Sequence, residues 1–206
     1  CQMSKFGLVV LGAHIGIHIK SEVQEILPEK ILLVEPVPHN VKAIKKNLIN
    51  LDGVIIEQVA LSNKNESKNF YFVKEDSIHK LKKHWSSGIG SFNKQHIFDH
   101  KSKRFKIEDE DIEKISINTI RFKDLVEKYQ IKQINKLIID VEGSEYEILS
   151  DIDFNYLDIK KILFEYKHFD GYKKTGKKLE EILEKLNKNG YETKKIDDEN
   201  ILAIKK

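Results

Sequence analysis

Short apolar runs alternate along the chain with segments whose apolar residues recur at helical spacing. Residues 6–11 form the first continuous apolar run, residues 12–16 form a glycine-rich turn, and apolar side chains at helical spacing follow in residues 17–27. A short apolar run is typical of a strand buried on both faces, whereas helical spacing is typical of an amphipathic helix. This opening predicts a buried strand, a tight turn and a helix.

The same alternation continues in the next part of the chain. Residues 30–36 predict a second buried strand that ends at Glu35 and Pro36, residues 41–49 predict a helix, and residues 54–59 predict a third strand. A parallel neighbour needs a helix to return the chain across the sheet, and such crossovers are right-handed. The pattern therefore predicts an α/β fold with a parallel sheet.

The alternation of apolar runs with helical spacing is interrupted at about residues 63–113. An aromatic stretch is followed by a polar segment in which Trp85, Phe92 and Phe98 stand among many lysines. A connection of this length without its own structure is unusual inside a compact domain. We predict an antiparallel hairpin and a lid that closes over a substrate, and a disordered insertion is the alternative.

Regular alternation returns in the second half of the chain. A seven-stranded sheet with helices on both faces and one domain over residues 1–206 are the resulting expectations. The predicted strands cover residues 115–120, 136–141, 160–165, 191–196 and 200–204, and the predicted helices cover residues 122–129 and 177–186 and a segment that begins at 142–145.

Composition narrows the class of protein. Hydrophobic residues make up 40% and charged residues 33% of the chain, and no apolar run approaches the ~18 residues of a membrane span. Cys1 is the only cysteine, which excludes an internal disulfide and a thiolate cluster and favours a cytoplasmic location. The opening Cys-Gln-Met is compatible with a start at Met3 or with a longer precursor, and we expect neither a membrane span nor a signal peptide.

The charge pattern argues against a nucleic-acid partner. The net charge is +3, from 36 basic and 33 acidic residues, and arginine occurs only at Arg104 and Arg121. Nucleic-acid binders concentrate arginine and lysine on one face and interleave aromatic residues. That pattern is absent here, so we expect no nucleic-acid partner.

Two features at the ends of the first strands point to a nucleoside cofactor. The turn Gly12-x-x-x-Gly16 before a helix offers free N–H groups to an anionic group, although glycines also serve there for packing alone. Glu35, at the end of the second strand, is placed to accept hydrogen bonds from both hydroxyls of a ribose. The turn lacks the three-glycine spacing that favours a pyrophosphate, which favours S-adenosylmethionine over NAD.

Four segments, in this order and spacing, resemble the FkbM-like family of methyltransferases. The segment that ends at Glu145 is the most specific of the four, and the resemblance covers nearly the whole chain. They are Gly12-Ala-His-Ile-Gly16, Val34-Glu35-Pro36 with Asn47 in the following helix, Val59-Ala-Leu-Ser62, and Leu137-Ile-Ile-Asp-Val-Glu-Gly-Ser-Glu145.

The resemblance implies a Rossmann-like class I methyltransferase fold with strand order 3-2-1-4-5-7-6 and an antiparallel last strand. It also implies S-adenosylmethionine as methyl donor, S-adenosylhomocysteine as product, and O-methylation of a sugar, glycan or other secondary-metabolite hydroxyl. The cofactor-binding residues that it implies are Gly12, Ala13, His14, Gly16, Glu35, Pro36, Ala60, Ser91 and Asp140.

Two positions depart from the family pattern. Family members usually carry Asp where this chain has Val10, and Asn where it has His14. The missing carboxylate leaves a degenerate, non-catalytic binding domain as the alternative. A nucleic-acid methyltransferase ranks last, because the chain has Asp140-Val-Glu-Gly where that class has an Asn- or Asp-Pro-Pro-aromatic motif.

Methyl transfer to a hydroxyl needs a group that removes the acceptor's proton. Asp140, Glu142, Glu165 and His168 are the candidates, because all four are expected at the carboxyl ends of the fourth and fifth strands. Each is also compatible with a helix cap or a salt bridge at the rim. We assign no metal ligand, although three carboxylates leave Mg²⁺ open as a minor alternative.

A pair of histidines in the lid segment has the spacing of metal ligands on a helix. His96 and His100 are four residues apart, with Asp99 between them. No helix is predicted there, so a solvated loop is the preferred interpretation.

Overall fold

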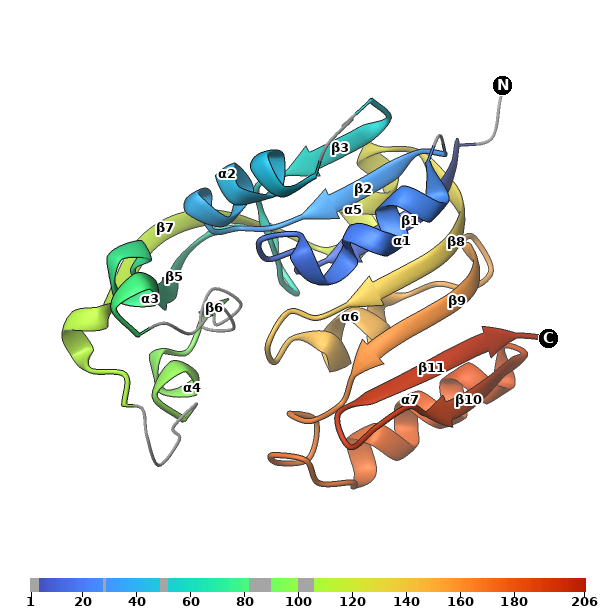
Figure 1. The fold of residues 1–206 in the computed structure, drawn as a ribbon. Helices are drawn as coiled ribbons and strands as arrows, with labels where there is room; N and C mark the ends of the chain where they lie inside the picture. The colour runs from blue at the N-terminus through green and yellow to red at the C-terminus, as the bar shows by residue number, and fades with distance from the viewer. Residues whose placement is uncertain (1–3, 28, 49–51, 82–89, 100–105) are drawn as a thin grey trace.

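A seven-stranded, mostly parallel sheet forms the centre of the protein (Figure 1). The structure is a computed structural model that describes residues 4–27, 29–48, 52–81, 90–99 and 106–206. From one edge of this sheet to the other, the strands are β3 (Val54–Glu57), β2 (Ile31–Val34), β1 (Ser4–Leu11), β8 (Ile131–Ile139), β9 (Asp158–Glu165), β11 (Asn200–Lys205) and β10 (Tyr191–Lys195).

The order of these strands confirms the fold expected from the sequence. Numbered along the chain within this sheet alone, they lie in the order 3-2-1-4-5-7-6. Neighbours from β3 to β9 are parallel, whereas β11 runs antiparallel to both β9 and β10. The chain therefore has the Rossmann-like class I methyltransferase topology.

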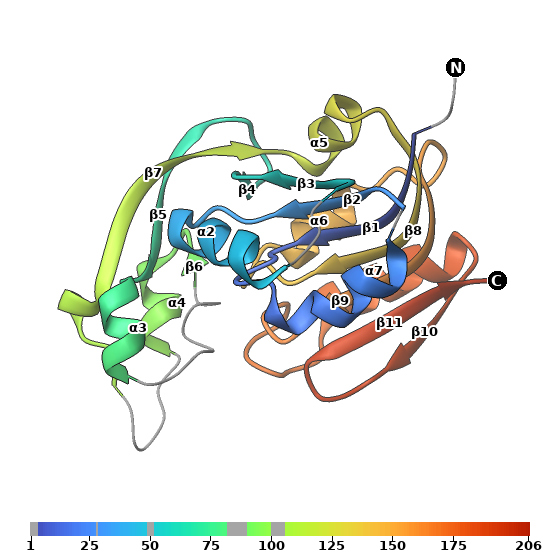
Figure 2. The ribbon, with the colours of Figure 1, turned by 45° about the horizontal axis from the view of Figure 1, so that its top comes forward.

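Helices cover both faces of the sheet, as Figures 1 and 2 show. Leu8 and Val10 of β1 pack with residues of the first two helices, and Val9 and Leu11 pack with residues of the last three. Successive side chains of a strand point to opposite faces, so a strand covered on both sides must be apolar throughout. The helices are α1 (Lys20–Ile26), preceded by η1 (Ile17–Ile19), and α2 (Pro38–Asn47) on one face, and α5 (Phe122–Lys128), α6 (Glu145–Asp151) and α7 (Lys177–Lys188) on the other.

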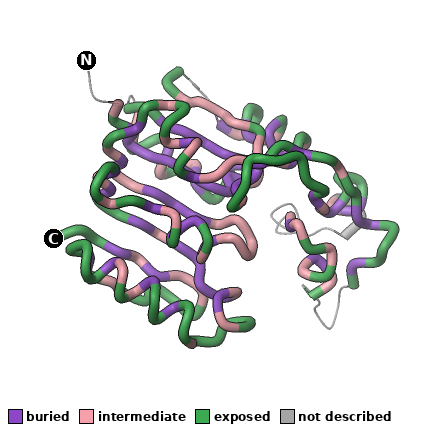
Figure 3. Tube along the Cα trace, turned by 180° about the vertical axis from the view of Figure 1, so that it is seen from behind, coloured by how far each residue is buried: buried purple, intermediate pink, exposed green. Residues whose placement is uncertain are grey.

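Burial follows this layering. The central strands form a buried band between helices that expose their outer sides (Figure 3). The first half of β8 is less apolar: Ile131 and Ile134 are buried, with polar residues between them. It nevertheless pairs with the start of β1, from Ser4 to Phe6. This strand begins five residues before the predicted residue 136, because only Ile131 and Ile134 are buried in its first half and no continuous apolar run marks it.

A smaller second sheet extends from one end of the main sheet (Figure 2). Its two long strands pair antiparallel, from Ser67 opposite Asn118 to Val73 opposite Ile112. The sequence predicted an antiparallel hairpin in this region but not a four-stranded sheet. Its strands, in order, are β4 (Ala60–Leu61), β7 (Ile112–Ile120), β5 (Ser67–Val73) and β6 (Gly90–Ser91), and the helices beside it are α3 (Glu75–Leu81), α4 (Lys94–Asp99) and η3 (Asp109–Asp111).

Two apolar clusters hold the second sheet. Val73, Ile97 of α4, Ile107 and Ile112 form one of them. The other contains Val37, which precedes α2, together with residues of β4, β5 and β7. The second cluster therefore fixes one end of the small sheet against the carboxyl ends of the main strands.

Among the described residues, none of the helices combines the length and the apolar character that crossing a bilayer requires.

Candidate functional site

The glycine turn after β1 packs directly against the chain at the end of β8. Gly12 has φ +88°, and a Cβ placed on it would lie 1.8 Å from the carbonyl oxygen of Asp140. The N–H groups of Gly12 and Ala13 donate to the carbonyl of Val34, at 2.9 and 3.0 Å. No side chain fits at Gly12 without displacing backbone, so this residue brings the ends of β1, β2 and β8 together.

Gly16 has a different role in the same turn. Its φ of +83° lies in the left-handed region, but a Cβ there would meet Ile44 and Leu48 of the α2 segment at an ordinary 3.5 Å. Backbone conformation, and not lack of space, therefore favours glycine at this position.

Glu35 is a buried carboxylate at the end of β2, with 2% of its surface exposed. It accepts hydrogen bonds from the backbone N–H of His14 at 3.0 Å and of Val37 at 2.9 Å, and from Asn40 Nδ2 at 3.3 Å. Burial raises the pKa of Glu35, and the charge of His14 and these donors oppose the rise. Two of the three bonds go to Oε2, so Oε1 retains room for another donor.

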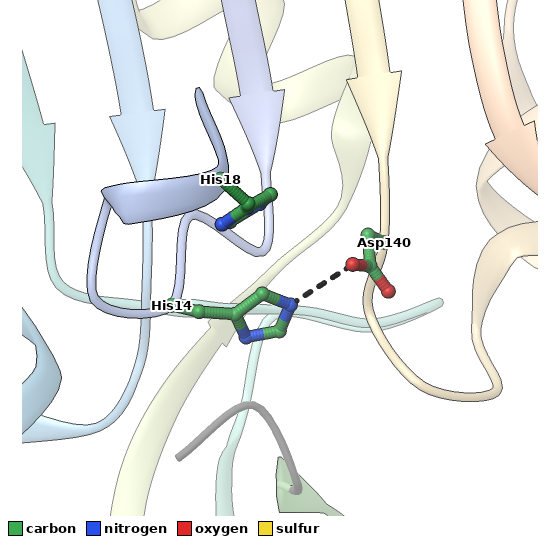
Figure 4. Close-up of side chains that lie close together, drawn as sticks. All are labelled: His14, His18 and Asp140. Atoms are coloured by element: carbon green, nitrogen blue, oxygen red, sulfur yellow. Dashed lines mark hydrogen bonds and ion pairs between the residues drawn. The ribbon is translucent and has the colours of Figure 1, made fainter. Parts of the chain in front are cut away.

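His14 joins two carboxylates that come from different strands (Figure 4). Its Nε2 donates to Asp140 Oδ2 at 3.1 Å, and its Nδ1 lies 3.8 Å from Glu35 Oε1. Burial lowers the pKa of His14, but Asp140, Glu35 and Glu142 outweigh it and raise the pKa to about 9. The imidazole therefore carries a positive charge at neutral pH. Its backbone has φ +50°, in the left-handed region.

Asp140 follows β8 and continues its pairing with β1, since its N–H donates to the carbonyl of Leu11 at 2.8 Å. Its Oδ2 accepts the bond from His14. Its Oδ1 is buried and has no hydrogen-bond partner among the described residues. A buried carboxylate oxygen without a donor is costly, which makes this atom a candidate for ligand binding.

A buried ionic cluster lies beyond Asp140, at the ends of β8 and β9. Lys167 is 8% exposed, and its Nζ lies 3.3 Å from Glu165 Oε1 and 3.8 Å from Glu142 Oε1. Burial opposes the charge of Lys167, but the surrounding carboxylates outweigh it and raise its pKa. Burial, and then the charges of Asp140 and Glu142, raise the pKa of Glu165. The lysine is thus held charged, and Glu165 is biased towards its neutral form.

His168 and Glu142 form a second pair within this region. His168 Nε2 lies 3.3 Å from Glu142 Oε2, and the His168 ring stacks on His96 of α4, with centroids 5.7 Å apart. His96 Nδ1 in turn lies 3.2 Å from Ser91 Oγ. Residues of the small sheet therefore contact the ends of the main strands.

Glu145 has a structural role at the start of α6. It is 1% exposed and accepts hydrogen bonds from the N–H groups of Val141 at 3.2 Å and Gly143 at 2.9 Å. Burial raises its pKa to about 8, with smaller contributions from Glu142 and Asp140. It thus satisfies backbone donors in the loop between β8 and α6.

Some of these groups line one pocket between the two sheets. Phe70, Gly90 and Phe92 of the small-sheet region line it from one side. Seven of the residues predicted from the sequence line it as well: Gly12, His14, Glu35, Pro36, Ala60, Asp140 and Glu142. The other five predicted site residues lie outside its lining: Ala13, Gly16, Ser91, Glu165 and His168.

Sequence reasoning missed several residues that the site contains. Asn40 bonds to Glu35 from the first turn of α2, and Lys167 neutralises the buried carboxylates. A polar residue early in a helix and a lysine after a strand are both common on surfaces, so neither gave a signal. His96, interpreted as a solvated residue, lies on α4 against His168. Trp85 and His100, predicted in the lid segment, lie outside the described residues.

Comparison with known proteins gives one family. The family described as "Methyltransferase FkbM domain" matches residues 11–193. No curated protein matches the chain.

Solved structures with a similar chain path share little sequence. A putative methyltransferase from Thermoplasma acidophilum is 11% identical, with a TM-score of 0.43 over 99% of this chain and 70% of its own. The fibrillarin pre-rRNA processing protein from Methanococcus jannaschii is 12% identical, with a TM-score of 0.43 over 98% of this chain and 66% of its own. The precorrin-6y C5,15-methyltransferase from Geobacter metallireducens is 12% identical, with a TM-score of 0.42 over 100% of this chain and 82% of its own.

Proposed function

Because the chain belongs to the methyltransferase FkbM domain family, we propose that it transfers a methyl group from S-adenosylmethionine to a hydroxyl of a sugar, glycan or other secondary metabolite. One observation carries the proposal: Gly12, Glu35 and Asp140, from the ends of three strands, line a single pocket. This pocket lies where the strand order reverses, between β1 and β8. Open α/β sheets bind their ligands at such switch points.

The residues present fit a nucleoside cofactor with an amino-acid end. Gly12 gives close approach to backbone, and Glu35 Oε1 has room to accept a bond from a ribose hydroxyl. Asp140 Oδ1, buried without a donor, would receive the cofactor's ammonium group. Ala60, Phe70 and Phe92 would supply apolar and aromatic surface for the adenine.

Three predicted cofactor-binding residues lie outside the lining and remain part of this proposal in supporting roles. Ala13 and Gly16 would shape the turn around the cofactor, and Ser91 would hold the small sheet in place through His96.

S-adenosylmethionine, when bound, supplies an activated methyl group. The chain must then take up the proton of the acceptor hydroxyl. We assign this role to His168, with Glu142 as the carboxylate that orients its ring through Nε2. In that tautomer Nδ1 accepts the proton. Glu165 is a weaker candidate because its raised pKa favours the neutral form, and Asp140 already accepts a bond from His14.

The proposal is tested first by binding. Calorimetric titration of the purified chain should show S-adenosylmethionine binding and no NAD binding. Glu35→Gln should weaken the affinity roughly 10- to 100-fold, because a hydrogen bond to a charged group contributes about 1.5–3 kcal/mol. The matched control is Glu57→Gln: Glu57 ends the next strand but bonds to Lys128 outside the pocket, so the affinity should not change.

Turnover tests the chemical step. Release of S-adenosylhomocysteine would be followed with a panel of sugar and phenolic hydroxyl acceptors. His168→Gln should lower kcat about 10²- to 10⁴-fold with little change in the affinity for S-adenosylmethionine. An unchanged kcat in this variant would remove His168 from the mechanism.

A non-catalytic binding domain is the second candidate, and Val10 favours it. Val10 is fully buried among apolar residues such as Ala13 and Ile19, so the end of β1 provides no carboxylate. A folded protein that binds no S-adenosylmethionine would support this candidate and contradict the first.

A further inference from the structure

We propose that His14, His18 and Asp140 form a binding site for a divalent transition-metal ion, of the kind that Zn²⁺ and Co²⁺ occupy. One ligand atom from each residue lies within 4.8 Å of the others. Figure 4 shows the two imidazoles on the turn after β1 and the carboxylate after β8. This inference goes beyond the proposed function and does not depend on it.

The spacing of the three side chains suits such an ion. Zn²⁺ binds imidazole nitrogen and carboxylate oxygen at about 2.0–2.2 Å, so neighbouring ligand atoms in a tetrahedral site lie roughly 3.3 Å apart. His14 Nε2 and Asp140 Oδ2 are already 3.1 Å apart, and a bound ion would displace the proton that His14 Nε2 donates to Asp140. The His18 ring lies 5.3 Å from the His14 ring, centroid to centroid. His18 is an exposed residue on the short η1 turn.

The surroundings resemble those of metal-binding histidines. Such a histidine usually has a carboxylate or carbonyl behind its other nitrogen, which fixes the ring. Glu35 Oε1 stands in that position, 3.8 Å from His14 Nδ1. The second oxygen of Asp140, Oδ1, is buried and has no hydrogen-bond partner among the described residues. It is therefore available as a further ligand atom.

Two other groups of possible ligands fit a metal ion less well. Glu142, Glu165 and His168 also lie close together, but the ammonium of Lys167 sits 3.3 Å from Glu165 and 3.8 Å from Glu142. The charge of Lys167 would repel a metal ion at this position. The third group consists of Asp140, Glu145 and Glu165. In this group the carboxylate of Glu145 already accepts hydrogen bonds from two backbone N–H groups.

Ligand chemistry selects the class of ion. Two imidazoles and one carboxylate suit Zn²⁺, Co²⁺, Ni²⁺ or Cu²⁺, whereas Mg²⁺ and Ca²⁺ prefer oxygen ligands throughout. The site also has open positions, because only three residues of the described chain supply ligands.

The metal site and the proposed cofactor site share His14 and Asp140. Metal binding is therefore measured on the full chain without any nucleoside, so that its result does not depend on whether S-adenosylmethionine binds. The protein is freed of metal with a chelator, the chelator is removed, and Co²⁺ is added while the visible absorption of the ion is recorded. Zn²⁺ is then titrated by calorimetry.

The expected result is one ion for each chain and a visible Co²⁺ spectrum typical of low coordination number. His14→Asn and His18→Gln should each weaken binding about 100-fold or more, since loss of an outer partner alone costs about 10- to 100-fold. Asn tolerates the left-handed backbone of residue 14, and His18 is exposed, so at least the second variant should fold.

Two histidines elsewhere provide matched controls. His39→Ala removes an imidazole that packs on Phe72, away from the cluster, and should leave Co²⁺ binding unchanged. His168→Ala tests the competing group of ligands. Retained binding in His18→Gln together with loss in His168→Ala would overturn the proposal, as would the absence of Co²⁺ binding by the folded parent chain.

Discussion

At Gly12 the backbone of one strand end meets the backbone of another. The Cβ of any other residue would lie 1.8 Å from the carbonyl oxygen of Asp140, and the φ of +88° disfavours such a residue in any case. Two costs therefore combine at one position, a strained backbone and a collision. The sequence marks the glycine but does not name Asp140 as its neighbour.

The two costs can be separated by measurement. Gly12→Ala should lower the free energy of unfolding by about 3 kcal/mol, of which about 1 kcal/mol is backbone strain and the rest is displacement of the β8 end. Gly190→Ala is the matched control, because Gly190 has φ +87° but no atom within 4 Å of its added Cβ. Urea denaturation of both variants gives the difference, and equal losses would contradict the collision.

At the scale of the element, the loop between β8 and α6 depends on one buried acid. Glu145 accepts hydrogen bonds from the N–H groups of Val141 and Gly143. The N-cap residue of α6, Ser144, makes no capping hydrogen bond with its side chain. The sequence predicts that a glutamate suits this helix start. Its near-complete burial, which changes its titration, follows only from the packing of α6 against the sheet.

That burial predicts a pH dependence of stability. The folded pKa of Glu145, about 8, is raised above its usual value of 4.5, so the folded state keeps a proton that the unfolded state loses. Stability from this group is complete below about pH 4.5 and falls as the pH rises to 8, by at most about 1.4 kcal/mol for each pH unit. Glu145→Gln should therefore make the fall in unfolding free energy over this range shallower.

Denaturation at several pH values measures this effect. Glu147→Gln is the control, since Glu147 lies on the same helix but is exposed, and it should reproduce the slope of the parent chain. A Glu145→Gln slope equal to that of the parent would show that Glu145 does not hold a proton in the folded state.

At the scale of the whole molecule, the pocket is a product of two sheets. Its lining takes Gly12, Glu35 and Asp140 from the main sheet and Phe70 and Phe92 from the region of the small one. A ligand that fills it should therefore stabilise both parts at once.

Hydrogen exchange with and without S-adenosylmethionine tests this arrangement. At a concentration 100 times Kd, binding stabilises the folded chain by about 2.7 kcal/mol. Slower exchange is expected both in the turn after β1 and in β5 and β6, while β10 at the far edge should change least. Protection limited to the turn would show that the small sheet takes no part in the site.

The sequence by itself determined the order of elements and the fold class. Continuous apolar runs marked β1 and β2, because a strand covered on both faces buries nearly all of its side chains. The motif segments determined the family, and the seven-stranded order followed. The start of β8 was missed, because only two separated residues, Ile131 and Ile134, are buried there.

Only the tertiary structure decided which side chains meet. The pairing of His14 with Asp140 spans 126 positions, and that of His168 with Glu142 brings two strand ends together. The second sheet needs pairing between β5 and β7, which lie far apart in the chain. Local patterns report the burial of each segment, whereas contacts between distant segments depend on register and packing, which no single segment encodes.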